Sequence, residues 1–343
     1  MITILKNIKR TKFWYLIIDY LIYPFYHFIW SYIINFNAKI LFFLWSFKNK
    51  EFFSLNKKDK LLVGSTDEFK SLSKDILLES ANLVEDSKKI ICSDEYSQKM
   101  KKTNFAAGKI PYAISLYEKL SPPLQSKIVK FASSPKMINT AANYMGVFPI
   151  LTRVQVSLNI PRENSDLRGA MFWHKDGFGF KNLDFFMCVT DLNEMNGPFY
   201  CLEEKIKSGI FKSFNIHFND RGERNKVPLE VFDKKFKDKK IIKLVGNSGT
   251  GIFLDSFSTY HRGGYCKKND RIMLRLCYQT QDAICETFDN YDDAYPFDKS
   301  ISKKNTNDIF LKFLFFKKPF FIVRIIKKFL IKAYYLIEYR YRV

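Results

Sequence analysis

The hydrophobic period of the chain changes near residue 150, and this change limits the folds available to it. Residues 151–160, LTRVQVSLNI, alternate polar with apolar side chains. Period-two alternation is typical of a β-strand with one buried face. Further strand-like runs follow at 183–192, 198–203, 241–245, 251–255 and 271–280. Short strands separated by turn residues, with no helical period between them, predict an antiparallel sandwich or barrel.

The part of the chain before this change, residues 66–147, has a helical period instead. We predict helices over 67–86, 111–120 and 122–132, because Pro111 and the pair Pro122–Pro123 are placed to begin two of them. The expected fold is therefore α+β with a mainly β core, in one domain over residues 61–300 that includes these helices. Hydrophobic residues make up 47% of the chain, which is enough to fill such a core.

The net charge of +21 is concentrated at the two ends of the chain. Residues 1–50 hold seven basic residues and one acidic residue, and residues 303–343 hold eleven basic and two acidic residues. Within the N-terminal segment, 1–60, the nearly continuous apolar run 13–34 has about the length that spans a bilayer. Asp19 disfavours spanning by roughly 2.5–3.5 kcal/mol, so we expect an interfacial or re-entrant helix.

The C-terminal segment, 301–343, is expected to form a basic amphipathic helix. Large apolar residues surround four basic residues that recur on one helical face. These are Lys317, Arg324, Lys328 and Lys332. The pattern is typical of a helix lying on an anionic membrane surface. Two alternatives stay open: a helix packed on the core with its lysines outward, and a nucleic-acid-binding segment, which fits so many large aliphatic residues less well.

The cysteines indicate neither a zinc ribbon nor a disulfide scaffold, because they form no C-x-x-C pair. They are Cys92, Cys188, Cys201, Cys266, Cys277 and Cys285. No cleavable signal is evident near the N-terminus. We therefore expect a reducing, cytoplasmic setting, peripheral to the inner face of a membrane.

The segment FWHKDGF carries a candidate metal site. His174 and Asp176 are two residues apart, and in a strand or at its edge such residues point to the same side. The chain has four histidines, of which His27 lies in the apolar run and His217 in a polar, loop-like stretch. His261 is therefore the expected third ligand. Two imidazoles and one carboxylate leave three metal positions open, as non-haem Fe(II) requires to bind a chelating co-substrate and O₂.

A dianionic keto acid at such a metal also needs a cation at its far end. Arg271 follows His261 by ten residues, and the intervening turn can bring its guanidinium back beside the metal. Arg275 faces the same way in a strand and is the alternative anchor. Gln155 and Ser157, on the polar face of the first strand, are candidates to hydrogen-bond the keto acid or the substrate. Their alternative is to face solvent on an edge strand.

The neighbours of the ligand pair are less informative. Phe172 and Trp173 can line the pocket, although aromatic residues beside a ligand more often belong to the core. Lys175 is expected to point away from the metal, and we assign it no role.

Several motifs of residues 130–282 together resemble one family. They are H-x-D, the run ending D-L-N-E-M-N-G-P-F-Y, the segment G-I-F-L-D…Y-H-R-G-G and R-I-M-L-R-L-C-Y. This part of the chain resembles the phytanoyl-CoA dioxygenase family of Fe(II)/2-oxoglutarate oxygenases. The resemblance implies a double-stranded β-helix, a jelly-roll or cupin-like barrel, in which His174, Asp176 and His261 bind iron. It also implies that 2-oxoglutarate chelates the iron while Arg271 binds its distal carboxylate.

The sequence as a whole predicts a 2-oxoglutarate-dependent dioxygenase that acts on a small or lipid-linked substrate at a membrane surface. Because Asp176 is present, the site has no vacancy for a halide ligand, and hydroxylation is expected rather than halogenation. One alternative is a catalytically inactive β-barrel interaction module, against which the complete triad argues. Another is an oxygenase that acts on nucleic acid through the basic ends. The segment 205–240 is expected to be a pocket-lining loop, and its composition does not identify the substrate.

Overall fold

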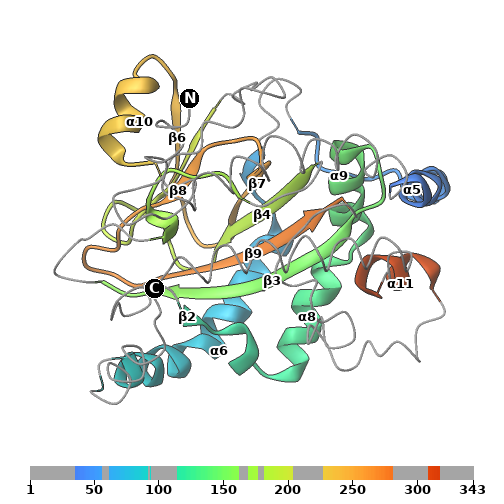
Figure 1. Ribbon diagram of the computed structural model, residues 1–343. Coiled ribbons are helices and arrows are strands. Elements are labelled where there is room, and N and C mark those ends of the chain that lie inside the picture. The colour runs from blue at the N-terminus through green and yellow to red at the C-terminus, as the bar shows by residue number, and fades with distance from the viewer. Residues whose placement is uncertain are drawn as a thin grey trace, which may run out of the picture.

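The strands of the protein form two antiparallel sheets, as a computed structural model of the chain shows (Figure 1). The structure describes residues 35–55, 62–91, 93, 114–161, 169–176, 181–203, 227–280 and 308–316. The larger sheet has the order β1-β7-β4-β9-β3-β2, and the smaller has the order β6-β5-β8. The expected mixture of helices with antiparallel sheets is confirmed.

Most strands of the larger sheet come from the segments that the alternation predicted. They are β1 (Leu62–Ser65), β2 (Ile114–Ser115), β3 (Ile150–Asn159), β4 (Asn182–Cys188), β7 (Thr250–Leu254) and β9 (Arg271–Gln279). The smaller sheet consists of β5 (Phe199–Leu202), β6 (Ile241–Leu244) and β8 (His261–Gly263). The sequence did not predict β1 and β8, which are short. His261 begins β8, which follows the end of β7 at Leu254 after a turn.

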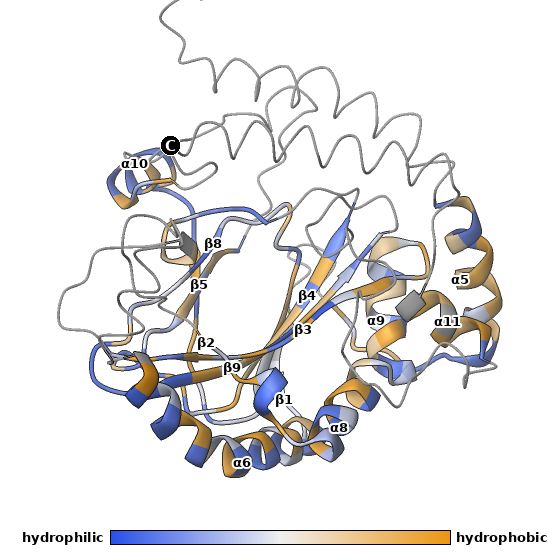
Figure 2. Ribbon diagram, turned by 60° about the horizontal axis from the view of Figure 1, so that its bottom comes forward, coloured by the Kyte–Doolittle hydropathy of each residue, from blue (hydrophilic) through white to orange (hydrophobic). Residues whose placement is uncertain are grey.

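Helices pack on one face of the larger sheet, and the smaller sheet faces the other (Figure 2). The helices on that face are α5 (Phe36–Lys48), α6 (Asp67–Ile91), α8 (Pro122–Ala132), α9 (Pro135–Met145) and α11 (Ile309–Phe316), whereas α10 (Leu229–Lys235) packs on the far side of the smaller sheet. Two 3₁₀ turns, η3 (Tyr117–Lys119) and η4 (Gly169–Met171), complete the described elements. Helix α8 begins with its two prolines in the first turn, as predicted, because proline lacks the N–H that a helix start leaves unbonded.

The helix predicted over residues 111–120 is wrong for its described part. Ile114 and Ser115 instead form β2, which pairs with Leu158 and Ser157 of β3. The backbone N–H of Leu116 then donates to the carbonyl of Val156 at 2.8 Å. An edge of the sheet therefore takes the backbone hydrogen bonds that a helix would have made within itself.

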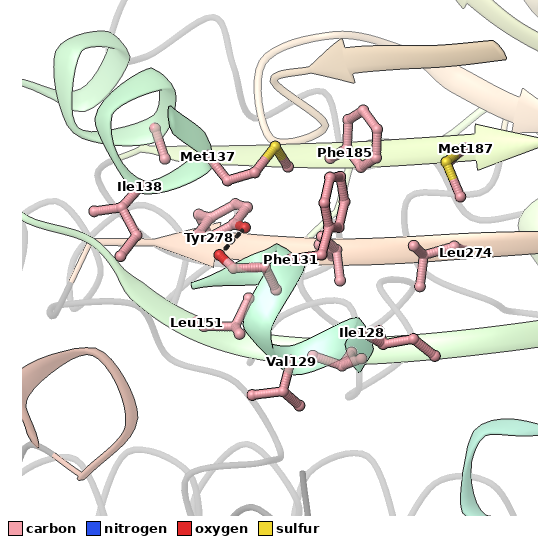
Figure 3. Packing of buried hydrophobic residues seen from close by; sticks show 14 of the residues in the cluster. Ile128, Val129, Phe131, Met137, Ile138, Leu151, Phe185, Met187, Leu274 and Tyr278 are labelled. Atoms are coloured by element: carbon pink, nitrogen blue, oxygen red, sulfur yellow. Dashed lines mark hydrogen bonds between the residues drawn. The ribbon is translucent and has the colours of Figure 1, made fainter. Parts of the chain in front are cut away.

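The alternation along β3 divides the interior into two layers. Val154, Val156 and Leu158 are buried against the helices, in the main core cluster. On neighbouring β9, the Tyr278 hydroxyl donates to the Ala132 carbonyl at the end of α8 at 2.6 Å (Figure 3). The opposite face of the sheet points toward the smaller sheet, and together with residues of β5 and β6 it forms a second, smaller apolar cluster. The polar side chains of β3 thus lie between the two sheets.

The described parts of the two basic ends lie side by side at one end of the larger sheet (Figure 1). Trp45 of α5 contacts Phe310 of α11 with ring centroids 4.9 Å apart, and both rings pack against Phe148. No described helix is long and apolar enough to cross a membrane. The predicted apolar helix over 13–34 and the basic stripe from 317 to 332 lie outside the described residues.

The packing between the larger sheet and the helices predicts a strong stability effect at Phe185. Its fully buried ring on β4 lies 5.0 Å from the ring of Phe69 and 4.8 Å from that of Phe253. Phe185→Ala should lower the free energy of unfolding by about 3–5 kcal/mol, because the cavity cannot close against neighbours held by the sheet and α6. Urea denaturation followed by circular dichroism measures this loss. Leu78→Ala, at a side chain 67% exposed on α6, is the control and should change it by about 0.5 kcal/mol or less. Equal losses in the two variants would contradict the packing described.

Candidate metal centre and its cavity

An antiparallel backbone pair brings the two candidate histidine ligands together. The N–H of His174 donates to the carbonyl of His261, and the N–H of His261 donates to the carbonyl of His174, both at 3.0 Å. Their rings consequently lie with centroids 4.4 Å apart. The N–H of Asp176 donates to the carbonyl of Ser256 at 2.9 Å, which holds the carboxylate beside the rings.

These three side chains form a compact group of metal-ligand atoms. The Nε2 of His174 lies 3.4 Å from one carboxylate oxygen of Asp176, and the Nε2 of His261 lies 3.5 Å from the other. All three ligand atoms lie within 4.8 Å of one another. Both histidines are buried, and Asp176 is half-buried. The group can hold a metal ion on one side and leave its other side to a ligand.

The hydrogen bonds of the two rings assign the nitrogen that faces a metal. The Nδ1 of His174 lies 2.7 Å from the carbonyl of Phe172, and the Nδ1 of His261 lies 3.1 Å from the carbonyl of Thr259. Because a carbonyl oxygen can only accept, each Nδ1 carries a hydrogen, which leaves Nε2 as the nitrogen that can offer a lone pair to a metal. Backbone carbonyls that fix the ring and its tautomer in this way are typical of metal-binding histidines.

The guanidinium of Arg275 lies between two carboxylates. Its Nη2 donates to Asp176 Oδ2 at 2.5 Å and also to Asp184 Oδ2. Burial by itself lowers the pKa of Arg275, but Asp184 and Asp176 raise it above its ordinary value, so the arginine stays charged. Burial by itself raises the pKa of Asp176, but Arg275 and the histidines hold it well below its usual range. Asp176 is therefore a carboxylate, ready to bind a cation.

The second arginine of β9 has neutral oxygen partners. The Nη1 of Arg271 donates to the carbonyls of Gly197 and Gly264, and its Nη2 donates to Asn159 Oδ1 at 3.1 Å. Arg271 is only 5% exposed. These hydrogen bonds hold its guanidinium in place, and they differ from those of Arg275, which go to two carboxylates.

Two glycines allow the chain segments around Arg271 to approach closely. A Cβ on Gly264 would meet the Pro198 carbonyl at 2.3 Å, and one on Gly197, whose φ is +77°, would meet the Tyr265 backbone at 2.6 Å. Any side chain there would separate the two segments. The carbonyls that accept from Arg271 therefore depend on glycine at both positions.

All seven residues that the sequence singled out line one cavity of about 320 Å³. They are His174, Asp176, His261, Arg271, Arg275, Gln155 and Ser157. Gln155 and Ser157 are not fully exposed to solvent, since both side chains are half-buried and line this cavity, and β2 pairs with β3 at Ser157. Which of these residues bind a ligand stays a prediction.

Trp173, next to His174, belongs to a different layer. Trp173 stacks on Phe232 of α10, with ring centroids 4.0 Å apart, in a cluster on the far side of the smaller sheet. Trp173 therefore lies in the core and does not line the pocket. Lys175 lies 4.9 Å over the ring of Tyr260, which fits the expectation that it points away from the metal.

The sequence did not identify four residues that shape the site. Asp184, fully buried, holds Arg275, and Asn159 holds Arg271. Phe186 and Phe199 add apolar walls to the cavity. Only Asp184 left a sequence signal, since it is a charged residue inside the apolar run LDFFMC of a strand.

No family model matches the chain, and no curated protein matches it. Among solved structures it is similar to the non-heme alpha ketoglutarate dependent carbocyclase SnoK from nogalamycin biosynthesis, at 13% identity and a TM-score of 0.35. That match covers 50% of this chain and 65% of the carbocyclase, so less than two thirds of the latter. EctD from S. alaskensis, with 2-oxoglutarate and 5-hydroxyectoine, matches at 15% identity and a TM-score of 0.38, over 65% of this chain and 73% of EctD. The non-heme monooxygenase ThoJ matches at 14% identity and a TM-score of 0.40, over 66% of this chain and 76% of ThoJ. Likeness at this level carries no argument, so the chemistry of the site rests on its own geometry.

The position of Arg275 between two carboxylates predicts a large stability effect. Arg275→Met should lower the free energy of unfolding of the metal-free protein by about 3–5 kcal/mol, because it leaves Asp176 and Asp184 without their shared cation. Adding Asp184→Asn should restore part of that loss, and urea denaturation of the single and double variants measures this coupling.

The control is an exposed ion pair on the helices. Lys127→Met, which removes the pair with Asp75, should cost about 1 kcal/mol or less. If Asp184→Asn adds its own loss to that of Arg275→Met, with no restoration, the two residues do not act as a pair.

Proposed function

We propose that the protein is an Fe(II)- and 2-oxoglutarate-dependent dioxygenase that hydroxylates a C–H bond of a small or lipid-linked organic substrate. The substrate, O₂ and 2-oxoglutarate would yield the hydroxylated product, succinate and CO₂. One atom of O₂ enters the product and the other enters succinate, and the keto acid supplies two electrons by losing CO₂. The observation that carries this proposal is the His174–Asp176–His261 face, which opens into a cavity with a buried arginine.

The ligand set fits iron. Two neutral imidazoles and one carboxylate supply three donors on one side, and a non-haem Fe(II) bound there supplies open positions for a chelating keto acid and for O₂. The thiol ligands that favour zinc or iron–sulfur clusters do not belong to this group. The presence of Asp176 favours hydroxylation over halogenation, since the carboxylate takes the position that a halide would need.

The two arginines support different roles. Arg275 is already held between Asp176 and Asp184, so its charge is compensated inside the protein. Arg271 is buried, held by the oxygens of Asn159, Gly197 and Gly264, and lines the cavity of the metal-ligand group, where its planar guanidinium can bind a carboxylate with paired donors. We assign the distal carboxylate of 2-oxoglutarate to Arg271, and to Arg275 the task of orienting Asp176.

The apolar walls of the cavity contribute by excluding water. Phe186, Phe199 and Met273 are each less than 10% exposed and lie on the inner faces of both sheets. A dry site strengthens every charge interaction within it and protects reactive species from water. The hydroxyl of Ser157 donates to the Met273 carbonyl at 3.5 Å, and by turning away from it the hydroxyl can donate to the keto acid instead.

We also propose that the scaffold is a double-stranded β-helix of the phytanoyl-CoA dioxygenase type. Its support is the path of the chain, which passes from β3 in the larger sheet to the His174–His261 bridge beside the smaller sheet, and then back to β4. It crosses again from β4 to β5, from β6 to β7, from β7 to β8 and from β8 to β9. Repeated crossing between two antiparallel sheets is typical of jelly rolls.

Anaerobic binding of Fe(II) and 2-oxoglutarate tests the proposed function. The chelated complex should give a weak visible charge-transfer band, which His174→Ala and Asp176→Ala should abolish because each removes a ligand. Arg271→Gln should lower the affinity for 2-oxoglutarate by about tenfold or more, because a charge-assisted contact is lost, and it should leave Fe(II) binding unchanged. Lys130→Gln, on the exposed face of α8, is the charge-matched control. If the unaltered protein gives no band and binds no 2-oxoglutarate, the chain is better explained as an inactive interaction module.

We propose further that the protein works at an anionic membrane surface, on the cytoplasmic side. Helix α5 supports this, because one of its faces is both apolar and exposed (Figure 2). The exposed residues are Phe36, Ile40, Phe43, Leu44 and Phe47, at 45–65%. The helix also carries Lys39 and Lys48 and no acidic residue, which complements anionic headgroups. Through Trp45 it packs on α11, where the basic C-terminal segment begins.

Vesicle flotation tests this surface. The full chain should bind vesicles that contain phosphatidylserine more strongly than neutral ones, and Phe43→Glu with Phe47→Glu should reduce that binding about tenfold or more, because two apolar contacts become anionic. Leu78→Glu makes the same kind of change at an exposed residue of α6 and should leave binding unchanged. Binding to RNA or DNA with steep salt dependence, and none to anionic vesicles, would favour a nucleic-acid substrate instead.

A further inference from the structure

The polar face of β3 changes in character from one end to the other. At one end Asn159 is buried and bonded to Arg271, and next to it Ser157 contacts the Met273 carbonyl. Toward the other end, Gln155 is half-buried and Arg153 is exposed. Within the described part of the chain, the side chains of Gln155 and Arg153 take part in no hydrogen bond or ion pair. The strand therefore has a closed, satisfied end and an open end with donors available to a ligand.

The metal-ligand group lies between these two ends. Pairing of β3 with β9 places Gln155 opposite Arg275, which binds Asp176, and Asn159 opposite Arg271 (Figure 1). Arg153 lies opposite Cys277, one inward-facing position beyond Gln155 and on the other side from Arg271. Two residues along a strand correspond to roughly 7 Å. A keto acid bound to Arg271 therefore approaches the metal from one side and leaves the Arg153 side to a second molecule.

The exposed charge on that side is positive, because Asp184, which lies in the same row of the sheet as Arg153 and Cys277, is fully buried and binds Arg275. Asp176, the carboxylate of the cavity lining, is already bound by Arg275 and flanked by both histidines. The exposed guanidinium of Arg153 thus determines which ligands the open end attracts. Arginine matches carboxylate and phosphate oxygens with paired donors. Two walls of the cavity, Phe186 and Phe199, are apolar, and Phe186 lies in the row of Gln155 and Arg275, next to that of Arg153.

We propose that Arg153, together with Gln155, binds an anionic group of the substrate, and that the substrate is an amphiphilic acid or phosphate with an apolar body. This inference rests on the proposed function for its reaction, but the anion site itself does not depend on iron. Its geometry also orients the substrate, since the oxidised C–H bond must lie near the metal while the anion stays at Arg153. Hydroxylation is then expected on the apolar body within roughly 7 Å of the anionic group, which is one inward-facing step of the strand.

Calorimetric titration of the full-length, metal-free protein tests this site with three matched probes: octanoate, octyl phosphate and octan-1-ol. At least one of the two anions should bind about tenfold more tightly than the alcohol. Arg153→Gln should lower the affinity for that anion about tenfold, as expected for loss of a charge-assisted hydrogen bond, and Arg153→Lys should restore most of the affinity. Lys130→Gln, which removes the same charge from α8, should have no effect. Comparison of octanoate with octyl phosphate distinguishes a carboxylate from a phosphate substrate.

A parallel titration with Arg271→Gln separates this inference from the proposed function. That variant should keep its affinity for the anionic probe and lose affinity for 2-oxoglutarate in the presence of Fe(II). If Arg271→Gln rather than Arg153→Gln abolishes probe binding, or if neither anion binds the unaltered protein, the proposed role of Arg153 is overturned even when iron and 2-oxoglutarate bind. If probe binding depends on Arg153 but iron and 2-oxoglutarate do not bind, the anion site is supported and the proposed oxygenase function is overturned.

Discussion

The guanidinium of Arg275, buried between Asp176 and Asp184, is the interaction on which the rest of the site depends. It keeps Asp176 ionised against the cost of burial, and it ties the ligand loop to the middle of the larger sheet. Asp184 is in turn held by Ser256, whose carbonyl accepts from the Asp176 N–H, so the same small network fixes the backbone and the side chain of the ligand. The metal face is thus an extension of the rigid sheet.

The two sheets contribute different parts of this arrangement. The larger sheet supplies charged and polar groups from β3 and β9, and its opposite face is anchored by the helices through an aromatic core. The smaller sheet supplies His261, and through the antiparallel bridge it also fixes His174. A functional site between two sheets can therefore be polar, because the hydrophobic stabilisation of the domain is concentrated on the other side of the larger sheet. The proposed roles follow this division, with co-substrate and substrate at opposite ends of β3.

Much of this could be predicted from residues 151–160 and from the H-x-D pair. Alternation along LTRVQVSLNI identified the strand and its polar face, and the spacing of Arg271 and Arg275 placed both on one side of β9. The 111–120 segment was misassigned because its helical spacing competes with an open sheet edge that sequence does not reveal. The position of Trp173 could not be predicted for a related reason: an aromatic residue beside a metal ligand can face either side of a sheet in a two-sheet fold.

By itself the sequence determined most of the strands, their inward faces and the three residues able to bind a metal, because side-chain direction in a strand follows from local spacing. Only the tertiary structure decided which arginine is paired with carboxylates, that Asp184 is the partner, and that Arg153 lies at the open end of the cavity. The reason is register: period two tells which face a residue occupies, but its neighbour across the sheet depends on how strands distant in the sequence are aligned.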